Sequence, residues 1–79
     1  MTRREFIDLI DFGSDIMFEL DEKSYSIIGG ADGGPNIAEQ ITENNEATFK
    51  NGKDLLDNYC INGETLRDCF ERIKITYYC

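Results

Sequence analysis

The sequence predicts a two-layer α+β domain, in which an antiparallel sheet of three to four strands is covered by an N-terminal helix and C-terminal helices. Apolar residues recur at helical spacing near both ends of the chain, and with a period of two residues between them. A length of 79 residues allows one small domain, residues 1–79.

Residues 3–12 are expected to form the first helix. Thr2 and Glu5 have the spacing of a capping box, in which each side chain accepts a hydrogen bond from the other residue's backbone N–H. Gly13 supplies the left-handed conformation that commonly ends a helix. The apolar side of this helix is formed by Phe6, Ile7 and Ile10.

Residues 16–28 predict an antiparallel hairpin, because two alternating runs are separated by a polar turn at 21–24. One face of the hairpin is apolar and needs a cover, which the amphipathic helices can provide. This core face is predicted to consist of Ile16, Phe18, Leu20, Tyr25 and Ile27.

Residues 29–35 contain four glycines, a composition that invites a phosphate-loop interpretation. Their spacing fits neither the dinucleotide-binding fingerprint nor the Walker loop, and Asp32 lacks the acidic partners of a calcium loop. We therefore expect a hairpin loop, with Pro35 ending the strand ladder. A small-molecule site in the glycine-rich loop, using its backbone N–H groups, stays open as an alternative.

Residues 36–42 alternate like a strand, although they could equally open a helix. We favour the strand, because the hairpin edge would otherwise remain unpaired and two strands alone are marginally stable. A turn at 43–46 and a short strand at 47–49, which brings Phe49 toward the core, are expected to follow.

The last third of the chain is predicted to be helical. Asn51 can cap a short helix whose buried side consists of Leu55, Leu56 and Tyr59. After a break at Asn62-Gly63, a second helix is expected, with an ion pair between Asp68 and Arg72. Its apolar side is formed by Leu66, Cys69, Phe70 and Ile73. Residues 75–78 are either a terminal strand or an exposed aromatic tail.

Charge is distributed unevenly along the chain. Sixteen acidic residues against eight Lys and Arg give a formal net charge of −8, and residues 5–46 alone carry −10. Such a field repels phosphate backbones, so we expect no direct nucleic-acid binding. The acids form either a solvated surface that maintains solubility or a surface for a basic partner, and both interpretations stay open.

The available side chains argue against catalysis and metal binding. The chain has no histidine, the commonest general base, and its three cysteines lack a fourth ligand for zinc. Cys60, Cys69 and Cys79 form no C-x-x-C pair, which indicates a reducing compartment and a cytoplasmic location. We expect no enzymatic activity, no cofactor and no metal. We also expect no membrane anchor, because no apolar run approaches about 20 residues.

Four stretches carry a resemblance to known sequences. They are Glu5-Phe6-Ile7 followed by Gly13 and Ile16-Met17-Phe18, then Lys23-Ser24-Tyr25-Ser26-Ile27, then Asp54-Leu55-Leu56, and then Ile61-Asn62-Gly63-Glu64-Thr65-Leu66-Arg67-Asp68. The chain resembles a group of short acidic bacterial proteins with a helix, a G-K-x-Y-S-I-type hairpin and an I-x-G-x-x-L-x-D helix start. The resemblance implies this fold and a bacterial or phage setting, and it implies no activity.

Two functional hypotheses follow. The first is a non-enzymatic, cytoplasmic protein-binding or accessory domain that uses exposed Tyr77 and Tyr78 or a sheet edge, with a homodimer as one possible form. The second is an acidic inhibitor, such as an immunity protein or a phage-type anti-CRISPR protein. Its carboxylates would mimic nucleic-acid charge, because alternate strand residues lie ~7 Å apart, as successive phosphates do. These carboxylates are Asp15, Glu19, Asp21, Glu22, Asp32, Glu39 and Glu43.

Overall fold

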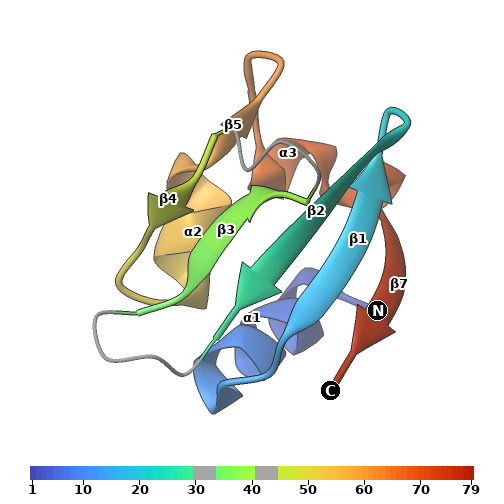
Figure 1. The fold of residues 1–79 in the computed structure, drawn as a ribbon. Coiled ribbons are helices and arrows are strands. Elements are labelled where there is room, and N and C mark those ends of the chain that lie inside the picture. The colour runs from blue at the N-terminus through green and yellow to red at the C-terminus, as the bar shows by residue number, and fades with distance from the viewer. Residues whose placement is uncertain (30–33, 41–44) are drawn as a thin grey trace.

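The computed structural model describes residues 1–29, 34–40 and 45–79. Five strands form an antiparallel sheet in the order β4-β3-β2-β1-β7, and the helices pack on one face of it (Figure 1). The predicted two-layer α+β class is confirmed. In chain order the elements are α1 (Arg3–Phe12), β1 (Ile16–Leu20), β2 (Lys23–Ile28), β3 (Asn36–Glu39), β4 (Ala47–Thr48), α2 (Gly52–Asn58), β5 (Cys60–Ile61), β6 (Glu64–Thr65), α3 (Leu66–Cys69), the 3-10 turn η1 (Phe70–Arg72) and β7 (Lys74–Tyr78).

Helix α1 has the predicted bounds and the predicted caps. The N–H of Glu5 donates to Thr2 Oγ1 at 3.1 Å, and the N–H of Thr2 donates to Glu5 Oε1 at 2.9 Å. Gly13 ends the helix with φ of 100°. Local sequence signals therefore determine both ends of α1.

Strands β1 and β2 form the predicted hairpin, and its five core-face residues are all buried. The turn between the strands is shorter than the predicted 21–24, because Leu20 already pairs with Lys23. Asp21 and Glu22 make the turn with φ of 50° and 68°. Two consecutive positive φ angles are the pattern of a type I′ turn, which normally favours Asn-Gly.

The described part of 36–42 is a strand, as favoured above. Residues Asn36–Glu39 form β3, which pairs with β2 on one side and with the two-residue strand β4 on the other. Phe49 follows β4 and is half-buried, with its ring edge-on to Tyr59 at 6.1 Å between centroids. The end of the predicted strand, residues 41–42, and most of the glycine-rich loop lie outside the described residues.

The first C-terminal helix is confirmed, and a small hairpin follows it. Asn51 caps α2 by accepting a hydrogen bond from the N–H of Asp54 at 2.9 Å. The predicted break at Asn62-Gly63 is the turn of the β5–β6 hairpin, with φ of 54° and 85° at these residues. The hairpin itself was not expected from the sequence.

The second C-terminal helix is much shorter than predicted. Helix α3 ends at Cys69, the chain tightens into η1, and Ile73 is already extended. The predicted pair between Asp68 and Arg72 is wrong, because the tighter 3-10 turn no longer stacks residues four apart. Arg72 instead donates to both carboxylate oxygens of Glu64, at 3.0 and 3.1 Å, on the adjacent β6 strand.

The terminal segment is a strand, so the sheet has one strand more than predicted. Strand β7 pairs with β1, and the register shifts between Met17 and Phe18. Ile75 lies opposite Phe18, whereas Tyr77 lies opposite Met17, so Thr76 is the extra residue of a β-bulge. The Thr76 hydroxyl donates to the backbone oxygen of Met17 at 3.2 Å.

Four aromatic rings connect the layers of the core. Phe6 of α1 lies edge-on to Phe18 of β1 at 6.3 Å and edge-on to Phe70 of η1 at 5.2 Å between centroids. Phe18 stacks on Tyr25 of β2 at 5.2 Å. Cys69 is fully buried beside them, which confirms its expected place in the core. These contacts fix α1, η1 and the central hairpin relative to one another.

Helices α1 and α2 approach closely at Gly52. A Cβ atom at this position would lie 3.0 Å from the backbone oxygen of Ile7 and 3.1 Å from its Cα. The N–H of Gly52 also donates to Asp11 Oδ1 at 2.8 Å. The packing of the two helices therefore depends on the absence of a side chain here.

We predict that Gly52→Ala lowers the free energy of unfolding by about 1–3 kcal/mol, because the backbone of Ile7 must move. Urea denaturation followed by circular dichroism measures this change. Lys53→Ala, at the exposed neighbouring position, should stay within about 0.5 kcal/mol of wild type. Equal stability of Gly52→Ala and wild type would contradict the prediction.

We further predict that replacing Asp21-Glu22 by Asn-Gly raises the free energy of unfolding by about 1 kcal/mol, because asparagine and glycine tolerate positive φ better than the two acidic residues do. The same denaturation experiment applies. Glu22→Ala is the control, since it removes the charge and keeps the Cβ atom. A stabilisation by Glu22→Ala as large as that by the double change would show that charge, rather than backbone conformation, is responsible.

Candidate functional site

Strand β7 is an edge strand. Within the part of the chain that the structure describes, it pairs with β1 on one side and has no neighbouring strand on the other (Figure 1). The N–H and C=O groups of an edge strand that point away from the sheet can pair with another chain. The five residues of β7 therefore offer a template for an additional strand.

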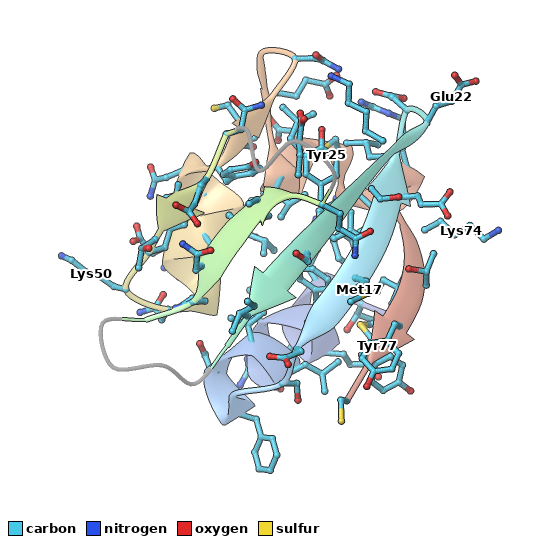
Figure 2. The ribbon with its side chains drawn as sticks, in the orientation of Figure 1. Met17, Glu22, Tyr25, Lys50, Lys74 and Tyr77 are labelled. Atoms are coloured by element: carbon cyan, nitrogen blue, oxygen red, sulfur yellow. The ribbon has the colours of Figure 1, made fainter. Side chains whose placement is uncertain are left out.

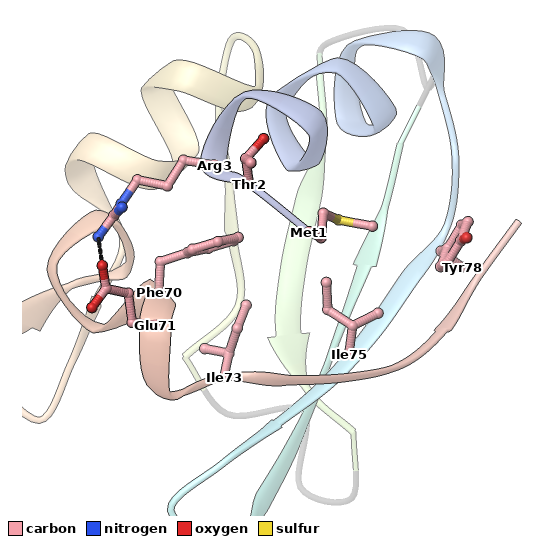
Figure 3. Close-up of a pocket in the computed structure, with 8 residues that line it drawn as sticks. All are labelled: Met1, Thr2, Arg3, Phe70, Glu71, Ile73, Ile75 and Tyr78. Atoms are coloured by element: carbon pink, nitrogen blue, oxygen red, sulfur yellow. Dashed lines mark ion pairs between the residues drawn. The ribbon is translucent and has the colours of Figure 1, made fainter.

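A cavity of about 760 Å³ lies between β7 and the N-terminal end of α1 (Figure 3). Two of its apolar lining residues, Ile73 and Ile75, are only half-buried against the core. The cavity is lined by Met1, Thr2, Arg3, Phe70, Glu71, Ile73, Ile75 and Tyr78.

A second cavity of about 440 Å³ continues along the same side of α1. It shares Met1 and Tyr78 with the first and adds Glu5, Asp8, Leu9 and Phe12. We call the two cavities together the α1–β7 groove. The groove follows the free edge of the sheet, on the side of the helix layer.

The bulge at Thr76 decides which tyrosine faces the groove. Tyr78 lies opposite the buried Ile16 and faces the helix layer, whereas Tyr77 lies opposite Met17 on the outer face of the sheet (Figure 2). The two phenol side chains have similar exposure, with Tyr77 50% and Tyr78 57% exposed. Of the two tyrosines singled out from the sequence, only Tyr78 therefore lines the groove.

Phe12 is the most exposed large apolar side chain of the described residues, at 87%. It lies in the last turn of α1, away from the buried Phe6 and Ile10, and it lines the groove. Met1 and Tyr78, which line the same cavity, are also exposed, and a contiguous exposed apolar patch is a feature of binding surfaces. Phe12 thus adds an apolar contact at the end of the groove.

The charged groups of the groove are mostly engaged with one another. The Arg3 guanidinium lies 3.7 Å from Glu71 Oε1, donates to the backbone oxygen of Arg67 at 3.0 Å, and stands over the Phe70 ring at 5.4 Å (Figure 3). Asp8 accepts from Arg4 at 3.3 Å. Lining the groove are two cationic groups, the Met1 ammonium and Arg3, and three carboxylates, so its walls carry one net negative charge.

Hydrogen bonds stabilise the charged form of Glu5, one of these carboxylates. The backbone N–H and the hydroxyl of Thr2 lower the pKa of Glu5 below its ordinary value of 4.5. On the opposite face of the sheet, a hydrogen bond with Cys79 raises the pKa of the Tyr77 phenol. Both shifts favour the form that each group already has at neutral pH, the charged carboxylate of Glu5 and the neutral phenol of Tyr77.

The carboxylates proposed from the sequence do not share one face. Glu19 lies on the outer face of β1, whereas Glu39 pairs in register with the buried Tyr25 on the helix side. The Glu39 side chain is 12% exposed and lies 3.7 Å from the Lys23 ammonium. Asp21 and Glu22 are exposed at the tip of the β1–β2 turn (Figure 2).

Three further proposed carboxylates lie elsewhere. Asp15 is exposed just before β1, and its backbone oxygen accepts from the N–H of Cys79 at 3.1 Å. Asp32 and Glu43 lie outside the described residues. The outer face of the described sheet carries one acid, Glu19, which pairs in register with Lys74. A row of carboxylates along this face is therefore not formed by the described strands.

Sequence reasoning missed most of the groove. Periodicity marked Phe6 and Ile10 as core and gave no role to Phe12, and it placed Ile73 on a helix. An apolar residue off the main stripe of an amphipathic helix was the available signal for Phe12. The cavity beside β7 had no sequence signal, because it depends on where α3 ends.

Comparisons with protein-family models, curated proteins and solved structures found no match to this chain. The resemblance to short acidic bacterial proteins therefore stays a prediction. Among the described residues, no group of three or more His, Cys, Asp and Glu side chains is arranged to hold a metal ion. No helix in this part of the chain is long and apolar enough to cross a bilayer.

We predict that Thr2→Ala raises the pKa of Glu5 toward 4.5, because the hydroxyl and the ordered N–H of the cap no longer stabilise the carboxylate. Because the pKa of Glu5 is lower in the folded than in the unfolded state, the ionised carboxylate stabilises the fold at pH values above the unfolded-state pKa. This stabilisation is lost as the pH falls through the lower, folded-state pKa. NMR titration of the Glu5 carboxyl carbon measures the shift. Thr2→Ser retains the hydroxyl and should keep the pKa low, and identical titrations for all three chains would contradict the prediction.

Proposed function

We propose that the chain is a non-enzymatic protein-binding domain that holds its partner at the edge strand β7 and in the α1–β7 groove. The observation that carries the proposal is the coincidence of two features along one side of the molecule. A free strand edge provides backbone hydrogen-bonding groups, and the adjacent groove offers apolar side chains in reach of water.

The exposed apolar side chains support this location. Phe12 and Tyr78 line the groove, and both are more than half exposed. Aromatic residues are enriched at the centres of protein interfaces, where they contribute large apolar area at small entropic cost. A partner that covers Phe12 and Tyr78 would remove both from water and close the helix layer at the edge of the sheet.

The acidic inhibitor is the alternative hypothesis. Its proposed carboxylates lie on opposite faces of the sheet where they are described, with Asp21 and Glu22 alone at the β1–β2 turn. A partner that recognises nucleic-acid-like charge would contact this turn rather than the groove. The experiment below separates the two locations.

We predict that peptides selected from a random display library against the wild-type chain bind in the groove. The double variant Phe12→Ala/Tyr78→Ala should weaken their binding at least about tenfold, or about 1.4 kcal/mol, because it removes two apolar contacts. Fluorescence anisotropy with labelled peptides measures the dissociation constant. Both side chains are exposed, so circular dichroism should show an intact fold.

The matched control is Met17→Ala/Ile28→Ala. These residues are 38% and 54% exposed, they lie outside β7, and neither lines the groove. The control should change affinity less than about twofold. Failure to select any peptide above background, or an equal loss in both double variants, would overturn the proposal. Loss of peptide binding only when Asp21-Glu22 is replaced by Asn-Gly would favour the acidic-inhibitor hypothesis.

A further inference from the structure

We infer that the partner segment is an extended, cationic peptide that adds to β7 as a sixth strand of the sheet and directs alternate apolar side chains into the α1–β7 groove. This inference rests on the proposed function and specifies the chemistry of the partner. It combines three observations: the pairing of β7, the position of the groove, and the charge of its walls.

The geometry of the sheet places the groove under an added strand. Neighbouring strands lie about 4.8 Å apart, so a chain paired with β7 would run directly beside it. Side chains of such a chain alternate between the two faces, and one set points to the same side as Ile75 and Tyr78. These two residues line the groove, so the added side chains on that face would enter it.

The groove is large enough for several side chains and is apolar where they would arrive. The cavity beside Ile75 has a volume of about 760 Å³, and its apolar lining includes Phe70 and Ile73. The second cavity, with Leu9 and Phe12, continues along the helix. An alternating peptide could therefore bury more than one apolar side chain without displacing the core.

The charge of the protein favours cationic residues at the remaining positions of the peptide. Glu5, Asp8 and Glu71 line the groove against two cationic groups, the Met1 ammonium and Arg3, so one net negative charge remains. Arg3 already contacts Glu71. The chain as a whole carries −8. A cationic segment is attracted both by the groove and by the net negative charge of the whole chain. A second copy of this chain, pairing β7 with β7, would instead bring two strongly negative molecules together. The observations therefore favour a cationic segment of another protein over a homodimer.

The test uses the peptides selected against the wild-type chain. We expect them to combine lysine or arginine with apolar residues at alternate positions. For the tightest peptide, N-methylation of every second residue removes the backbone donors along one edge of the strand. One of the two methylated sets should weaken binding at least about tenfold, because it faces β7, and the other should have an effect of less than about threefold.

Charge is tested with the same peptide. Replacement of its lysine and arginine residues by glutamate should weaken binding at least about tenfold. Raising the salt concentration from about 0.05 to 0.5 M should also lower the affinity of the unmodified peptide. Tyr78→Ala removes a side chain that lines the groove and should reduce affinity. The control Met17→Ala, on the outer face of the sheet and outside β7, should leave affinity unchanged. An ¹⁵N-labelled sample should show the largest shifts at the amides of β7 and α1.

The outcomes separate this inference from the proposed function. Groove binding that is insensitive to the position of N-methylation, or equally strong for a glutamate peptide, overturns strand addition by a cationic segment and leaves the protein-binding function standing. Absence of any groove-directed peptide overturns both. Sedimentation velocity that shows a dimer broken by Tyr78→Ala would identify a second copy as the occupant and overturn the cationic partner.

Discussion

The contact of Phe6 with Phe18 and Phe70 is the interaction on which the rest of the architecture depends. It joins α1 to the sheet and to the 3-10 turn η1 in one place, with centroid separations of 6.3 and 5.2 Å. A small domain has few such contacts, because much of its surface remains in water. Each aromatic pair therefore accounts for a large share of what holds the two layers together.

The same cluster positions the candidate site. Phe70 packs against Phe6, and the backbone becomes extended at Ile73, directly after η1. Strand β7 therefore begins close to the aromatic contact. A longer α3 would have carried Ile73 over the core and left less chain for the edge strand. The short helix thus exposes Ile73 and Ile75 beside α1 and opens the groove.

Local signals in the sequence predict the parts of the fold that depend on neighbouring residues. The capping box of Thr2 and Glu5, the alternation through Tyr25 and Ile27, and the cap at Asn51 all appear in the structure as expected. The end of α3 and the Glu64–Arg72 pair depend on contacts between segments, which periodicity does not report. Tyr78 could be proposed as a contact residue from its position in an aromatic terminal segment. The cavity that it lines could not be predicted, because it also depends on contacts between segments.

The bulge at Thr76 also has a consequence for how this edge can diversify. Simple alternation from Ile75 would direct Tyr77 inward, and the extra residue directs Tyr78 inward instead. A single inserted or deleted amino acid in this strand would therefore exchange which aromatic side chain faces the α1–β7 groove, while the buried scaffold stays unchanged. The lining of the groove can in this way be altered by chain length alone, without any substitution.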